Sequence, residues 1–143
     1  MSGGRYGRLF VYGSLLPGMA NHGVLAPFLS GEARPGRVRG RLIDAGPYPA
    51  LWLGGAEAED GREPLVRGLW VEVTPAAWPT LDAFEGFVGA EEPNDYDRVW
   101  VRDADDGDVS GWAYVWESDR GCPFAASGWW PDAIRRRRGQ GNI

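Results

Sequence analysis

The chain reads Arg8-Leu9-Phe10-Val11-Tyr12-Gly13-Ser14-Leu15 near its N-terminus. Apolar, β-branched and aromatic residues followed by a glycine predict a buried strand that runs into a turn. Such a turn can point successive backbone N–H groups at one spot, where they hold a carboxylate or a developing oxyanion. Taken by itself, however, the segment favours an ordinary turn after a strand.

Further strands are expected along most of the chain, because segments rich in β-branched and aromatic residues alternate with glycines and charged turns. These segments are Arg37–Ile43, Tyr48–Leu53, Val66–Val73, Tyr96–Arg102 and Val109–Trp116. Pro49 indicates that its strand lies at an edge or carries a bulge. The acidic run Asp103–Asp108 predicts the turn of a hairpin. Short, glycine-punctuated strands interrupted by one helix favour a small barrel or a strongly curved sheet.

That helix is predicted after Thr74-Pro75, which supplies an N-cap residue and a first-turn proline. Trp78, Leu81 and Phe84 recur every three residues and would share one face, so Leu81 and Phe84 are expected to anchor the helix. Gly86 stands where a glycine commonly ends a helix.

Glu85 falls in the last turn of the predicted helix, off the anchoring face. The negative end of the helix dipole and burial beside aromatic residues would both raise the pKa of its carboxyl group. A raised carboxyl pKa suits a general base and acid near neutral pH. From this segment alone, a solvated acidic residue closing the helix is the favoured interpretation.

The last predicted strand carries an aromatic stripe, because alternation places Trp112, Tyr114 and Trp116 on one face. Most of these side chains are expected to face the core. A tyrosine at the edge of a pocket, such as Tyr96 or Tyr114, could donate a hydrogen bond to a substrate.

Length and composition favour one domain of 143 residues, with the segment Glu117–Ile143 expected to be a less regular tail. The formal net charge of −5 argues against general nucleic-acid binding. All fifteen basic residues are arginine, which excludes Schiff-base chemistry by a lysine. No apolar run approaches the length of a membrane span and no signal core begins the chain, so a cytoplasmic protein is expected.

Several other signals fail. One cysteine, Cys122, and one histidine, His22, exclude a disulfide within the chain and a Cys- or His-rich metal site. Ser14 lacks the Gly-x-Ser-x-Gly context of a hydrolase nucleophile. Asp103–Asp108 is not a calcium-binding loop, because its glycine falls one position too early and no glutamate closes the loop. The run Arg135–Arg138 is most simply a solvated tail.

Taken together, the segments resemble the γ-glutamylcyclotransferase-like family, and most of all its γ-glutamylamine cyclotransferase branch. The matching segments follow one another in the expected order through most of the chain: Phe10–Leu15, Asn21-His22, Tyr48–Ala50, Val66–Val71, Leu81–Gly86, Tyr96–Arg98 and Trp112–Trp116. The specificity lies in Tyr-Gly-Ser-Leu followed by Phe-Glu-Gly and Tyr-x-Arg. Trp129-Trp130 and the insert Gly54–Pro64 have no counterpart.

The resemblance implies an α+β fold, a small mixed β-barrel with flanking short helices and a pocket at one side. It also implies that the pocket binds a small γ-glutamyl compound and releases 5-oxoproline and a free amine without a cofactor or metal. The catalytic glutamate would be Glu85. The residues expected to bind the substrate are Tyr12, Gly13, Ser14, Leu15, Tyr96 and Tyr114.

Two alternatives belong to other classes. A non-catalytic module on the same scaffold would use the pocket to bind a small carboxylate or amine, and a position of Glu85 away from Tyr12–Leu15 would favour it. A Ser14-dependent hydrolase is the minor option. The leaving amine, the pathway and the oligomeric state stay open at the level of sequence.

Overall fold

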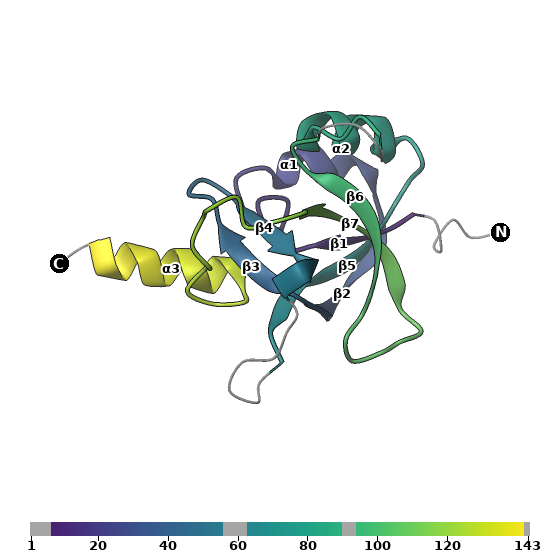
Figure 1. Cartoon of the computed structure of the whole chain (residues 1–143). Coiled ribbons are helices and arrows are strands. Elements are labelled where there is room, and N and C mark those ends of the chain that lie inside the picture. The colour runs from purple at the N-terminus through teal and green to yellow at the C-terminus, as the bar shows by residue number, and fades with distance from the viewer. Residues whose placement is uncertain (1–6, 56–62, 90–93, 142–143) are drawn as a thin grey trace.

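The strands form one mixed sheet of seven that curls into a half-barrel in a computed structural model, which describes residues 7–55, 63–89 and 94–141 (Figure 1). They are β1 (Arg8–Val11), β2 (Leu29–Arg39), β3 (Arg41–Asp44), β4 (Pro49–Trp52), β5 (Leu65–Val73), β6 (Asp97–Arg102) and β7 (Ser110–Trp116). The order across the sheet is β2-β5-β1-β7-β4-β3, with β6 paired to β7. The expected α+β class with a curved, mixed sheet is therefore confirmed.

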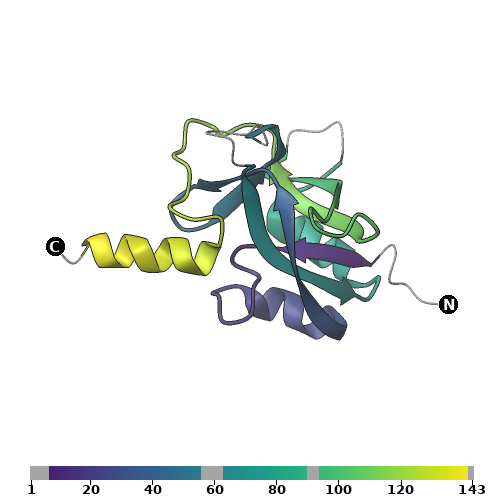
Figure 2. The same ribbon diagram turned by 90° about the horizontal axis from the view of Figure 1, so that it is seen from below.

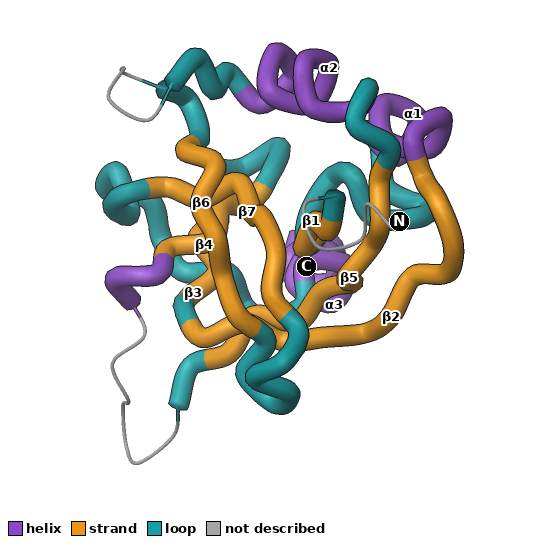
Figure 3. Tube along the Cα trace, turned by 90° about the vertical axis from the view of Figure 1, so that its right-hand side faces the viewer, coloured by secondary structure: helices purple, strands orange, loops and turns teal. Residues whose placement is uncertain are grey.

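Three short helices flank this sheet in the described part of the chain: α1 (His22–Leu25), α2 (Ala77–Glu85) and α3 (Trp130–Gly141). A 3₁₀ turn at Ala26–Phe28 continues α1. Helices α1 and α2 lie side by side over one end of the sheet (Figures 1 and 3), whereas α3 extends away from the body (Figures 1 and 2). None of the described helices has the length and apolar character needed to cross a membrane.

Strand β7 is the branch point of the sheet. One of its edges pairs antiparallel with β6 from Ser110 to Val115. Its other edge pairs in parallel with two strands in turn, β1 at Trp112 and β4 at Val115 and Trp116. The two partners diverge between these points, and the gap that they leave is a natural place for a pocket.

Tyr12 fills the base of this gap. It directly follows β1 and donates a hydrogen bond from its hydroxyl group to the Tyr114 carbonyl oxygen at 2.5 Å. The same hydroxyl oxygen accepts a hydrogen bond from the Leu51 N–H at 3.0 Å. One side chain thereby satisfies backbone groups of β7 and β4 that the diverging ladders leave unpaired.

Helix α2 ends as predicted but begins and packs differently. Gly86 adopts a left-handed φ of 71°, and the N–H groups of Gly86 and Phe87 turn back to carbonyl oxygens of the last turn. The N-cap position is Ala76 rather than Thr74, whose backbone carbonyl accepts the Ala77 N–H instead. Leu81 is fully buried as expected, whereas 41% of Phe84 is exposed, so Phe84 does not anchor the helix in the core.

The structure differs from one further expectation and adds a helix to the tail. Strand β4 lies between β7 and β3 rather than at an edge, and Pro49 is tolerated because it occupies the first position of that strand. The expected irregular tail contains the helix α3, whose Trp130 and Ala133 are buried in the core. The insert Gly54–Pro64 was expected as a charged loop, and its residues 56–62 lie outside the described part of the chain.

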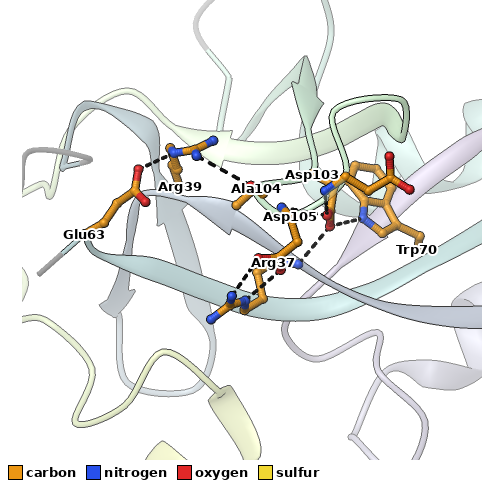
Figure 4. Close-up of polar contacts among 8 residues, drawn as sticks. Arg37, Arg39, Glu63, Trp70, Asp103, Ala104 and Asp105 are labelled. Carbon is orange, nitrogen blue, oxygen red and sulfur yellow. Dashed lines mark hydrogen bonds and ion pairs between the residues drawn. The ribbon is translucent and has the colours of Figure 1, made fainter.

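The predicted β6–β7 hairpin is confirmed, and its acidic turn is fastened to the sheet by Asp103 (Figure 4). One carboxylate oxygen of Asp103 accepts hydrogen bonds from the Trp70 indole N–H at 2.9 Å and the Arg37 backbone N–H at 3.0 Å. The other oxygen accepts from the N–H groups of Asp105 and Asp106. Burial alone would raise the pKa of Asp103, but these four donors outweigh burial and lower it.

Candidate active site

A cavity of about 480 Å³ opens at the gap between β1 and β4. All seven residues that the sequence singles out for a site contribute to its wall: Tyr12, Gly13, Ser14, Leu15, Glu85, Tyr96 and Tyr114. They come from the turn after β1, the last turn of α2, the residue before β6 and the middle of β7. The fold thus gathers into one cavity residues that are up to 102 positions apart in sequence.

Glu85 carries the chemically unusual group of the cavity. Its side chain is half-buried, and within the described residues no hydrogen-bond donor or cation is paired with its carboxylate. Burial raises the pKa of Glu85 to about 7. Its backbone is held from the opposite segment, because the Tyr96 N–H donates to the Glu85 carbonyl at 3.2 Å and the Asp95 N–H to the Gly86 carbonyl at 3.1 Å. A fixed, unpaired carboxylate that titrates near neutral pH can take up and return a proton.

The turn after β1 has its acceptors engaged and its donors unused. The carbonyl oxygens of Gly13, Ser14 and Leu15 accept hydrogen bonds from Leu16, Asn21 and His22. By contrast, none of the hydrogen bonds within the described residues is donated by the N–H groups of Gly13–Leu15. Three consecutive unused donors at a cavity wall suit the binding of a carboxylate or an oxyanion.

Gly13 is required by a close approach rather than by an unusual backbone angle. A Cβ atom at this position would lie 2.7 Å from Cγ of Pro49, the first residue of β4. The turn after β1 therefore packs directly on β4, which leaves no room for a larger residue. This contact fixes the distance between the turn and the opposite wall of the cavity.

The three tyrosines of the site have their hydroxyl protons committed to the protein. Tyr12 donates to the Tyr114 carbonyl, Tyr96 to the Pro49 carbonyl at 2.8 Å, and Tyr114 to the Asp82 carboxylate at 2.7 Å. Burial is the main reason that the pKa of each tyrosine is raised, so all three stay protonated. They line the cavity as expected, but their hydroxyl protons are already donated to protein acceptors, so they are not the free O–H donors that the sequence suggested.

An ion pair behind the cavity attaches α2 to the sheet. The Arg98 guanidinium donates to both carboxylate oxygens of Asp82 at 2.9 and 3.3 Å, and Tyr114 lies opposite Arg98 in the β6–β7 register. The guanidinium also packs within 5.3 Å of the ring centres of Trp78, Phe87 and Trp112. Asp82 precedes Glu85 by one helical turn, so this cluster sets where the catalytic candidate lies.

Sequence reasoning missed Arg120 and gave no site role to Tyr48 or Trp116, although all three line the cavity. Trp116 was placed in the aromatic stripe, but as a core residue. Arg120 had no signal, because it lies in a segment without periodicity. Its φ of 50° is the one positive φ of a non-glycine residue among those described, a backbone state that costs about 1–2 kcal/mol. Such strain often accompanies a functional position.

His22 has a structural role in the turn after β1. Its Nδ1 atom lies 2.8 Å from the Leu15 carbonyl oxygen, so the ring helps to hold the turn after β1. Cys122 is half-buried and in no disulfide. The described residues contain no group of three or more His, Cys, Asp or Glu side chains arranged to hold a metal ion.

Comparison with known proteins identifies the class. The chain belongs to the family described as gamma-glutamyl cyclotransferase, AIG2-like, whose model matches residues 9–132. No curated protein sequence matches the chain significantly.

Solved structures of low identity share the fold. YkqA of Bacillus subtilis matches with a TM-score of 0.66 and 24% identity over 93% of this chain and 42% of YkqA, so the chain spans less than half of that protein. An AIG2-like protein of Mus musculus matches with a TM-score of 0.63 and 24% identity, over 86% of this chain and 88% of the mouse protein. An uncharacterized Pyrococcus horikoshii protein matches with a TM-score of 0.63 and 18% identity, over 93% and 96% of the two chains.

Proposed function

We propose that the protein is a γ-glutamyl cyclotransferase that converts a γ-glutamyl amine or peptide into 5-oxoproline and a free amine, with Glu85 as the general base and acid. The observation that carries the proposal is the meeting of two complementary groups on one cavity. The unpaired carboxylate of Glu85 lines it from α2, and the unused N–H groups of Gly13–Leu15 line it from the turn after β1. Family membership supports the same reaction class.

The substrate supplies its own nucleophile. The α-amine of a γ-glutamyl group attacks the γ-carbonyl carbon of the same molecule, and closure of a five-membered ring makes this proximity highly effective. Between ammonium and lactam the attacking nitrogen loses two protons. The leaving nitrogen gains two protons if it departs as ammonium, while the new C–N bond replaces the old one. The overall reaction is balanced and needs only a group that moves protons between two nitrogens.

Glu85 fits this task because its carboxyl pKa is raised to about 7. Its ionised form takes a proton from the substrate ammonium, and its neutral form returns a proton to the leaving nitrogen. The N–H groups of Gly13–Leu15 would stabilise the oxyanion of the tetrahedral intermediate or hold the substrate carboxylate. We expect kcat/KM to fall as the pH drops below about 7, because the base form of Glu85 is then lost.

The test is the release of 5-oxoproline from a panel of γ-glutamyl amines and dipeptides by wild type and Glu85→Gln. The variant keeps the size of the side chain but cannot accept a proton, so its kcat should fall by about 10³-fold. Binding of the same substrates, measured by calorimetry, should change little. Glu117→Gln is the matched control, because Glu117 is exposed and does not line the cavity.

The outcomes separate the competing functions. Turnover by wild type and by Glu117→Gln, but not by Glu85→Gln, supports the cyclotransferase. Binding of γ-glutamyl compounds without any turnover by wild type would instead favour a non-catalytic binding module. Full activity of Glu85→Gln would remove the role proposed for Glu85.

A further inference from the structure

Arg120 gives the cavity a cation at its exposed rim. It is the one basic side chain among the described residues that line the cavity, and it is itself exposed. The exposed aromatic rings of Tyr48 and Phe84 also line the cavity, with 44% and 41% of their surfaces accessible. Glu85, in contrast, is half-buried. The cavity wall therefore carries half-buried Glu85, exposed Asp95 and, at its rim, the exposed cation of Arg120.

The backbone of Arg120 is held by its own turn. The Arg120 N–H donates to Ser118 Oγ at 3.2 Å, and the Gly121 N–H donates to Asp119 Oδ1 at 2.8 Å. These bonds support two successive residues of positive φ, 50° at Arg120 and 75° at Gly121. The side chain that this turn carries is exposed and forms part of the cavity wall.

The guanidinium group is positioned but not used up. It lies 4.2 Å from the ring centre of Trp116, and Nη2 donates to the Asp95 carbonyl at 2.7 Å and more weakly to the Asn94 carbonyl at 3.4 Å. Within the described part of the chain, Nε and Nη1 donate no hydrogen bond, and Arg120 forms no ion pair with a carboxylate. A planar cation with two free donor positions is suited to a carboxylate ligand.

We propose that Arg120 binds a carboxylate on the leaving amine, so that the preferred substrates are γ-glutamyl amino acids or peptides that end in a free carboxylate. This rests on the proposed function. The α-amine of the glutamyl group must reach Glu85, and its γ-carbonyl oxygen and α-carboxylate are assigned to the three unused N–H groups of Gly13–Leu15. What remains for the rim is the leaving group, whose anionic end would meet Arg120 and whose carbon chain would contact Tyr48 and Phe84.

The test compares two substrates that differ by a single charge, γ-glutamylglycine and γ-glutamylglycinamide, in kcat/KM for 5-oxoproline release. Wild type should favour the acid by about tenfold, the effect of one charge-assisted hydrogen-bonded contact. Arg120→Asn should lose this preference by slowing the acid about tenfold while leaving the amide within about twofold. Asparagine tolerates the left-handed backbone, so the turn is kept. Arg120→Lys should retain part of the preference.

Arg34→Asn is the control for the change in net charge, because Arg34 lies on β2, pairs with Asp106 and does not line the cavity. It should leave both substrates unchanged. Equal losses on acid and amide in Arg120→Asn would assign Arg120 to the glutamyl half of the substrate and overturn the proposal. Equal rates for both substrates in wild type would overturn it as well. Absence of turnover with every substrate would instead remove the cyclotransferase function, and this proposal with it.

Discussion

Two carboxylates near opposite ends of β6 differ in their hydrogen bonding and in the direction of their pKa shifts. Asp103, just after β6, accepts four hydrogen bonds that lower its pKa (Figure 4). The backbone carbonyl of Glu85 accepts the N–H of the residue before β6. Its side-chain carboxylate, however, accepts no hydrogen bond within the described residues, and burial raises its pKa to about 7. Asp103 therefore stays ionised at neutral pH, whereas Glu85 can take up and release a proton there.

The difference separates a structural acid from the acid that we propose to be reactive. A buried carboxylate is tolerable when hydrogen bonds replace the lost water, as they do at Asp103. A carboxylate that lacks these bonds destabilises the fold when ionised, so its presence calls for another explanation. At Glu85 that explanation is the proposed proton transfer. The comparison makes predictions about stability that are independent of any substrate.

The largest expected effect follows from Asp103→Asn. The amide NH₂ would face two N–H donors in place of an oxygen, so the free energy of unfolding should fall by about 3 kcal/mol. The measurement is urea denaturation at pH 7. Asp108→Asn, in the same turn but exposed, is the control and should cost little.

The pH dependence of this loss follows from the lowered pKa of Asp103. Its stabilisation is fully present above the pKa of an unfolded aspartate and is lost as the pH falls through the lower pKa of the folded state. The difference in the free energy of unfolding between wild type and Asp103→Asn should therefore disappear only at acidic pH. A gap unchanged down to strongly acidic pH would contradict the assignment of Asp103 as an ionised structural acid.

Glu85→Gln should act in the opposite direction. Because the folded-state pKa is raised from 4.5 to about 7, the ionised carboxylate destabilises the fold increasingly between these pH values and fully above them. Removing the charge should raise the free energy of unfolding by about 2 kcal/mol at pH 8, a value discounted for the partial exposure of the side chain. Below pH 4.5 the gain should vanish. Denaturant melts at pH 4, 6 and 8 measure this, and a gain independent of pH would show that repacking, rather than charge, is responsible.

The sequence analysis selected Glu85, the acid that we propose to be reactive, but gave no structural role to Asp103. Glu85 and Tyr12–Leu15 lie in short motifs with recognisable strand, turn and helix signals. Each motif alone favoured an ordinary turn or a solvated acid, and the family resemblance was needed to select these residues for a site. The role of Asp103 depends on Trp70 and Arg37, which reach it through the pairing of β2 with β5. The residues next to Asp103 in sequence do not indicate such a long-range strand register.

The rest of the site was missed for a similar reason. Arg120 lies in an irregular turn and has a positive φ. Residue type does not predict a positive φ at a position that is not glycine. Helix α3 was missed because arginines and glycines hide the burial of Trp130 and Ala133. The tyrosines were selected correctly as pocket residues, but their hydrogen-bond partners are set by the divergence of β1 and β4 from β7. The acceptor of the Tyr114 hydroxyl on α2 was therefore not foreseen.

The smallest expected effect comes from Tyr114→Phe, which connects the two regions of the comparison. Its hydroxyl donates to Asp82, but Asp82 also keeps two hydrogen bonds from Arg98. Losing one of the three hydrogen bonds to Asp82 should lower the free energy of unfolding by about 1 kcal/mol. The loss is smaller than that expected for Asp103→Asn, which leaves two N–H donors without an acceptor. Because Asp82 lies one helical turn before Glu85, we also expect the pH midpoint of kcat/KM to shift, whereas Asp103→Asn should leave that midpoint unchanged. A shift of equal size in both variants would mean that Glu85 responds to general loosening of the fold rather than to the position of α2.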